Sequence, residues 1–184
     1  TIRSRCQTLL LLKNKQSYQY AQENGLFKLL NRLQRNKGLK NALEVAAEIK
    51  KILDSLKESA EKYVEDNWDE RWEDTADENR ALQRQLEELR KTRIDSEYVR
   101  LREELIEAMK VWFQQRLLIA YSCKKEFLPQ QELLKFYESN EPELKDAKQD
   151  LEWVDEFARC LKANVDETLA LDTLCLSICE IIRE

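Results

Sequence analysis

The chain has 184 residues, a net charge of −5 and no histidine, and 36% of its residues are charged while 42% are apolar. Only two glycines and two prolines are present, far fewer than a sheet protein of this length needs for its turns, so the composition predicts an all-α fold. The acidic balance argues against a chain that grips DNA over its whole surface, and without histidine most general-base and metal schemes lose their usual residue.

Residues 1–7 include two arginines, Arg3 and Arg5, and lie just ahead of a run of four leucines at residues 9–12. This pattern predicts a basic loop or short helical turn that leads into a buried strand. A lone strand cannot satisfy its own backbone hydrogen bonds, and no second strand-like run follows. We therefore expect the chain to be the C-terminal part of a larger protein, with residues 1–13 as the end of a preceding domain.

Ser4, Arg5 and Cys6, flanked by residues 1–3 and Gln7, resemble the Ser-Arg-Cys motif of the bacterial sliding-clamp loaders. In that family the motif arginine is an arginine finger that reaches into the ATP site of a neighbouring subunit. The resemblance implies this role for Arg5, with Ser4 and Cys6 positioning it. A planar, permanently charged guanidinium suits phosphate oxygens and the charge of phosphoryl transfer. The alternative is an accidental match, in which Arg5 is a solvated surface residue.

Residues 14–57 show two sets of apolar residues at helical spacing, separated by a polar turn at residues 36–38. The apolar positions are Tyr18, Ala21, Leu26, Leu29, Leu30 and Leu33, followed by Leu39, Leu43, Ala46, Ala47, Ile49, Ile52, Leu53 and Leu56. The spacing predicts two or three short helices. A unit this small is marginal alone, so we expect it to dock on a larger domain. By resemblance it is the helical lid of a clamp-loader subunit.

Gly38 and the residues after it, 39–44, resemble the glycine turn and Ala-Leu helix start of that lid. In the ATP-binding subunits this helix start carries an arginine that touches the nucleotide. The nearest equivalent in this chain is Lys40, and its spacing from the glycine is one residue short. The departure favours the delta-prime subunit, which offers an arginine finger but does not itself hydrolyse ATP. An ordinary helix-turn-helix with Lys40 in water is the alternative.

A basic group and an acidic aromatic segment are two further candidate binding regions. Arg32, Arg35, Lys37 and Lys40 can face a phosphate or DNA, but we favour a solvated helix face. Trp68 and Trp72 lie four residues apart among acids, so they share one face of a helix. Exposed, the two tryptophans are a partner-binding anchor; buried, which we favour, they are core residues.

Residues 58–184 are predicted to form a larger helical bundle. Thr75 and Glu78 fit a capping box before a long helix, and residues 94–96 are a plausible break within it. The helical pattern on either side of that break fits either an antiparallel hairpin or one long helix. Its apolar face is too wide after Leu105 for a simple two-stranded coiled coil, which favours a globular bundle.

The last helices are predicted after Pro129, after Pro142 and after Asn164, which we expect to be an N-cap. The final one is apolar nearly all round, which predicts a central place in the bundle or in an assembly. Residues 161–169 resemble the asparagine-containing stretch between the last two helices of the delta-prime family, with Asp166 where a second asparagine often stands. Residues 111–118 resemble the family's aromatic-plus-arginine helix, with Arg116 near the usual basic position.

Several chemistries are missing from the sequence. There is no phosphate-binding glycine loop and no cluster of cysteines with zinc spacing. Cys175 and Cys179 lie one helical turn apart, but two thiols on an apolar face are far more often core than zinc ligands. Five scattered cysteines with no CxxC pair indicate buried thiols of a reducing cytoplasm. No apolar run approaches the roughly 20 residues of a membrane span.

The resemblance thus implies the C-terminal part of a delta-prime subunit of the DNA polymerase III clamp loader: residues 1–13 ending an ATPase-like domain, a lid at 14–57 and a collar at 58–184. It implies partners in the tau/gamma and delta subunits, with the sliding clamp and primed DNA reached only through the whole complex. No cofactor, metal or catalysis is expected in this part, since ATP is bound by neighbouring subunits. The alternatives are a tau/gamma subunit, and a free-standing helical adaptor with an accidental motif.

Overall fold

The computed structural model describes residues 18–35, 37–68, 80–128, 130–137 and 142–180, and throughout these ranges the fold is all-α, as predicted. The elements in order are α1 (Gln19–Glu23), α2 (Leu26–Arg32), α3 (Gly38–Asp66), α5 (Arg80–Ala120), the short 3₁₀ helices η2 (Lys125–Phe127) and η3 (Gln131–Phe136), α6 (Leu144–Lys162) and α7 (Glu167–Ile178). The strand expected at residues 9–12 lies outside the described ranges. No helix within them is long and apolar enough to cross a membrane.

The two glycines stand immediately before α2 and at the start of α3. Gly25 has a φ of 71° and Gly38 a φ of 81°, in the left-handed region where a side chain is strained. The turn predicted at residues 36–38 is therefore confirmed at Gly38. From there α3 runs for 29 residues, so the domain boundary expected between residues 57 and 58 falls inside one helix. The buried residues of α3 up to Leu56 share one core cluster with residues of α1, α2, α5, α6 and α7, so residues on both sides of the expected boundary contribute to the same core.

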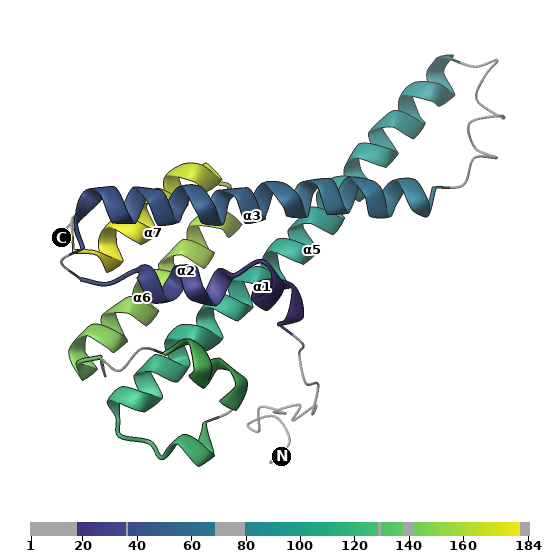
Figure 1. Cartoon of the computed structure of the whole chain (residues 1–184). Coiled ribbons are helices and arrows are strands. Elements are labelled where there is room, and N and C mark those ends of the chain that lie inside the picture. The colour runs from purple at the N-terminus through teal and green to yellow at the C-terminus, as the bar shows by residue number, and fades with distance from the viewer. Residues whose placement is uncertain (1–17, 36, 69–79, 129, 138–141, 181–184) are drawn as a thin grey trace, which may run out of the picture.

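α5 is one helix of 41 residues, so of the two alternatives the single long helix is found and residues 94–96 do not break it. None of these three residues is a proline or glycine, and Asp95 and Ser96 are exposed, so neither has to compete with the helix for buried hydrogen bonds. Burial is confined to the second part of α5: from residue 81 to residue 104 no residue is buried, whereas Leu105 and several later residues are. The first part of the helix accordingly extends beyond the bundle (Figure 1).

The bundle packs α3, α5, α6 and α7 around a core with a stack of aromatic rings. The Trp112 ring lies 4.2 Å from the Tyr137 ring, nearly parallel to it, and 5.7 Å from the Phe27 ring, between centroids. Trp112 and Phe27 are fully buried. Aromatic burial of this size contributes strongly to stability. The stack joins α2 to α5 and to the residue that follows η3.

The turn between α6 and α7 corrects one predicted cap. Asp166, not Asn164, is the N-cap of α7, and its Oδ1 accepts a 2.8 Å hydrogen bond from the Leu169 amide. Asn164 has a φ of 58° and belongs to the end of α6, where the Val165 amide donates to the Cys160 carbonyl. Asparagine tolerates this left-handed position better than most residues, so its place at a helix C-terminus has a physical reason.

Candidate functional site: a buried charge cluster

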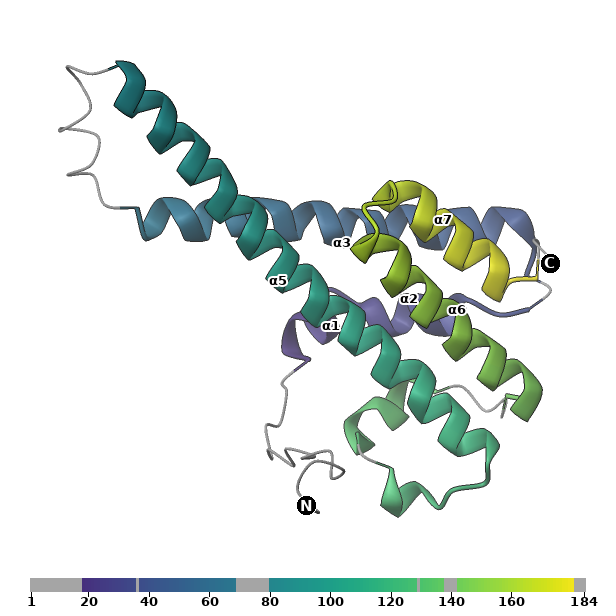
Figure 2. The same ribbon diagram turned by 180° about the vertical axis from the view of Figure 1, so that it is seen from behind.

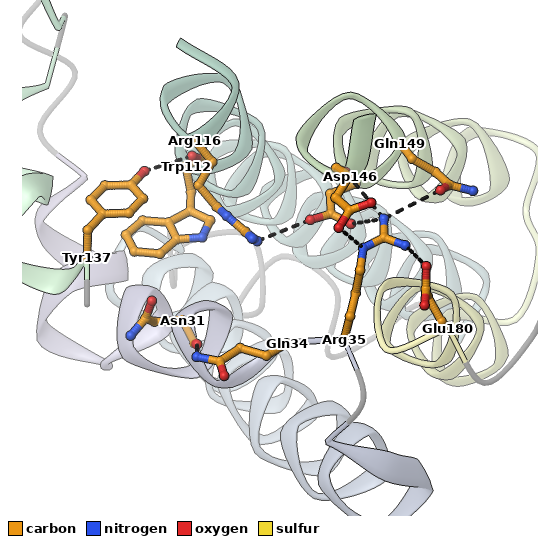
Figure 3. A network of polar contacts seen from close by, with 10 residues as sticks. Asn31, Gln34, Arg35, Trp112, Arg116, Tyr137, Asp146, Gln149 and Glu180 are labelled. Atoms are coloured by element: carbon orange, nitrogen blue, oxygen red, sulfur yellow. Dashed lines mark hydrogen bonds and ion pairs between the residues drawn. The ribbon is translucent and has the colours of Figure 1, made fainter. Parts of the chain in front are cut away.

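Arg35 is the centre of a cluster of charged side chains inside the bundle. It lies in the connection between α2 and α3, and its side chain is only 14% exposed. Its Nε lies 3.2 Å from Asp146 Oδ2, its Nη2 lies 3.1 Å from Asp150 Oδ1, and its Nη1 pairs with Glu180 (Figure 3). A guanidinium forks its donors in one plane, so one arginine can hold several carboxylates.

Asp150 carries the second half of the same cluster. Its side chain is 2% exposed, and its Oδ2 lies 3.2 Å from Nη1 of Arg116 on α5. The carboxylate therefore bridges two guanidiniums, one from the α2–α3 connection and one from α5. We call Arg35, Arg116, Asp146, Asp150 and Glu180 the Asp150 cluster. It ties together four parts of the chain: the α2–α3 connection, α5, α6 and the residues that follow α7.

Burial and pairing act in opposite directions on Asp150. Loss of water raises the pKa of its carboxyl to about 6, while Arg116 and Arg35 lower it and Asp146 raises it further. The cluster has two guanidiniums and three carboxylates, so its charges do not cancel when all are ionised. Buried charges at such a junction are stable only with partners in place. The cluster is consequently sensitive to the loss of any one member.

A cavity of about 280 Å³ adjoins the Asp150 cluster. Its lining residues outside the cluster include Asn31, Gln34, Tyr137 and Glu143. The Tyr137 hydroxyl donates a 2.9 Å hydrogen bond to the Trp112 carbonyl, and burial raises the pKa of that hydroxyl. The cavity wall is mixed, because Leu33 and Ile178 also line it, and Tyr137 connects it to the aromatic stack. The site therefore provides a fixed set of ion pairs, and the Tyr137 hydroxyl beside them already uses its proton in the hydrogen bond to Trp112.

A second, smaller cluster fixes the first turn of α7. The Tyr98 hydroxyl of α5 donates to the Glu167 carboxylate at 2.6 Å, and Arg102 Nη1 lies 3.1 Å from the same carboxylate. The Lys57 ammonium and the Arg102 guanidinium both lie over the Tyr98 ring, at 5.2 and 5.4 Å from its centroid. These contacts hold α7 against α5 and α3 at the end opposite the Asp150 cluster.

Ser4, Arg5, Cys6 and Trp72, the residues predicted for an arginine finger and a partner anchor, lie outside the described ranges. Trp68 is described, and it is half-buried with the Arg93 guanidinium 5.5 Å from its ring centroid. One side of Trp68 therefore packs against α5. Its burial lies between the exposed anchor and the buried core residue that the sequence allowed.

The four basic residues predicted to share a solvated face do not share one. Arg32 pairs with Glu48 at 3.0 Å and Glu44 at 3.8 Å on the surface, and Lys40 is 91% exposed. Arg35, in contrast, turns into the bundle, so the prediction is wrong for this residue. Arg35 points inward because it forms ion pairs with three carboxylates that lie 111 to 145 residues further along the chain.

Cys175 and Cys179 are buried, which confirms them as core residues. Burial raises the pKa of both thiols, so both are neutral at physiological pH. In the described part of the chain no group of three or more cysteine or acidic side chains is arranged to hold a metal ion.

Sequence reasoning noted Arg116 only through a resemblance and gave no role to Asp146, Asp150 or Glu180. One signal was present: Asp150 occupies an apolar position in the helical pattern of α6, between Ala147 and Val154, where an acid needs a buried partner. Comparisons with family models, curated proteins and solved structures found no match to this chain.

Proposed function

We propose that the chain is the C-terminal part of a delta-prime subunit of the bacterial sliding-clamp loader of DNA polymerase III. The observation that carries the proposal is the motif Ser4, Arg5 and Cys6, and the all-α fold of the described residues that follow it supports the proposal. A helical chain after the motif is what the family resemblance implies. In this proposal the chain's own task is assembly of a loader that places the clamp on primed DNA, with ATP bound by neighbouring subunits.

Within the proposal, Arg5 acts in trans on the ATP of an adjacent subunit. An arginine supplied from a neighbour stabilises charge that builds on the transferring phosphoryl group. Lys40 supports delta-prime over tau/gamma, because ATP-binding subunits carry an arginine in this region. Lys40 lies on the first turn of α3 with its ammonium in solvent, 3.8 Å from Glu44, an arrangement typical of a surface helix pair.

Co-elution tests the proposed assembly. The chain is mixed with the tau/gamma and delta subunits of the same organism and analysed by size-exclusion chromatography with light scattering. We expect a defined complex, because a collar associates through its folded surface. A folded chain that elutes alone in the presence of both subunits would refute the proposal.

The role of Arg5 is tested in the full-length subunit. Arg5→Ala is expected to leave assembly intact and to lower ATP turnover at the neighbouring site about a thousandfold or more, the range typical of an arginine finger. Arg3→Ala, two residues away, is the matched control and should retain turnover. Equal turnover in the Arg5 and Arg3 variants would contradict the finger assignment.

A second candidate is a free-standing helical adaptor, favoured by the first part of α5. Residues 81–104 form a helix that buries none of its residues in the chain's own core. A helix of this kind can present a surface to a partner. The co-elution result separates the two candidates, because an adaptor has no reason to bind clamp-loader subunits.

A further inference from the structure

The outward side of α7 carries apolar residues that the bundle does not cover. Leu169 is 60% exposed and Val165, just before the helix, is also exposed. Thr173 is exposed and Leu176 is partly buried. In Figure 2, α7 lies in front of α3 and beside α6, and no other described element crosses its outer side. The opposite side of the helix is buried, with Leu171, Leu174 and Cys175 among its residues.

These exposed residues form one stripe rather than a scatter. At 100° per residue, positions 169, 172, 173 and 176 fall within an arc of about 100°. The Thr173 hydroxyl donates to the Leu169 carbonyl at 2.8 Å, so its hydrogen-bonding need is met inside the helix. We call Val165, Leu169, Asp172, Thr173 and Leu176 the outer stripe of α7. Apart from Asp172, the stripe offers a partner mainly apolar surface.

Asp172 gives the stripe a charge that nothing in the described chain neutralises. α7 contains two acids, Glu167 and Asp172, and no lysine or arginine. Glu167 is held by Arg102 and Tyr98, whereas no ion pair joins Asp172 to any described side chain. A half-buried carboxylate beside the exposed Leu169 is complementary to a cation that arrives with an apolar surface.

We infer that the outer stripe of α7 is the surface on which a neighbouring subunit docks, through a helix that presents apolar side chains with a lysine or arginine among them. The inference rests on the proposed function, since it names the contact surface of the same assembly. Leu169 is its central anchor and Asp172 pairs with the incoming cation. Both ends of α7 are held, by the Glu167 contacts and by the Asp150 cluster beyond its last turn, so the stripe is presented by a fixed helix.

The test measures the dissociation constants of the chain for the tau/gamma and delta subunits by light scattering and fluorescence titration, at two salt concentrations. Leu169→Glu is expected to weaken binding at least about tenfold, the loss typical of a buried interface anchor. Asp172→Asn is expected to weaken it less and to reduce its salt dependence. The matched control is Leu144→Glu at the start of α6, where the side chain is 42% exposed, and it should bind like the original chain.

Circular dichroism and thermal melting establish that each variant is folded. If Leu169→Glu loses helix content, Thr173→Arg, an exposed position on the same stripe, takes its place. Equal binding by the stripe variant and the original chain would overturn the inference and leave the proposed function standing. Equal weakening by Leu144→Glu would also overturn it, because the effect would not be specific to α7. Absence of binding by the original chain would overturn both.

Discussion

Arg35→Met is expected to lower the free energy of unfolding by about 3–5 kcal/mol, the cost typical of removing one partner from a buried ion pair. Methionine keeps much of the side-chain volume but leaves the nearly inaccessible Asp150 carboxylate with one cation instead of two. Asp146 and Glu180 lose the same partner. Urea denaturation at pH 7, followed by circular dichroism at 222 nm, measures the change.

Arg32→Met is the matched control, three residues earlier in the same segment. Arg32 pairs with Glu44 and Glu48 in solvent, and exposed pairs of this kind contribute about 1 kcal/mol or less. The prediction therefore concerns the difference between two substitutions of the same type. If both variants lose equally little stability, the Asp150 cluster does not hold the bundle together.

The pH dependence of stability should change sharply in Asp150→Asn. The pKa of the carboxyl is about 6 in the folded chain, against 3.8 for the ordinary side chain. A raised pKa in an acid means that the folded state binds the proton more tightly, so stability from this group is fully present below pH 4 and is lost as the pH rises through 6. Relative to the original chain, the variant should gain on the order of 3 kcal/mol between pH 4 and pH 7.

Urea titrations at intervals of half a pH unit measure this difference directly. Asp155→Asn, which removes an exposed carboxylate from the same helix, controls for the change in net charge. The opposite result is that the stability of Asp150→Asn falls relative to the original chain as the pH rises. It would mean that Arg35 and Arg116 lower the pKa of Asp150 by more than burial raises it. The same experiment on Arg35→Met should show its stability loss to be smaller at pH 4, where Asp150 is protonated.

The helical class of the chain could be predicted because periodicity is a local property. Leucines and isoleucines at steps of three and four, and the scarcity of glycine and proline, specify helices without knowledge of distant contacts. The turn at Gly38 and the burial of Cys175 and Cys179 could also be predicted from the residues immediately around them. What periodicity gives is which face of a helix is buried, not which helix covers it.

The Asp150 cluster could not be predicted because its partners are far apart in the chain. Arg35 stands in a run of basic residues that is indistinguishable from a solvated surface until Asp146, Asp150 and Glu180 are brought to it. Asn164 shows a different limit, since an asparagine both ends and begins helices, and only the backbone angle separates the two. Asp95 and Ser96 show a third limit. Residues that often end a helix are tolerated on the exposed face of a long one, so their presence does not establish a break.

The uneven burial of α5 has a mechanical consequence. The helix is held from Tyr98 onwards, first by the contacts of Tyr98 and Arg102 with Glu167 and then by the core from Leu105, and the part that precedes Tyr98 rises about 27 Å at 1.5 Å per residue. This extended part therefore acts as a lever. A tilt of about 5° at the held end moves the far end by about 2 Å. A small repacking around Trp112 and Met109 therefore produces a larger displacement at the N-terminal end of α5. A substitution in the core can in this way move residues that lie outside the core.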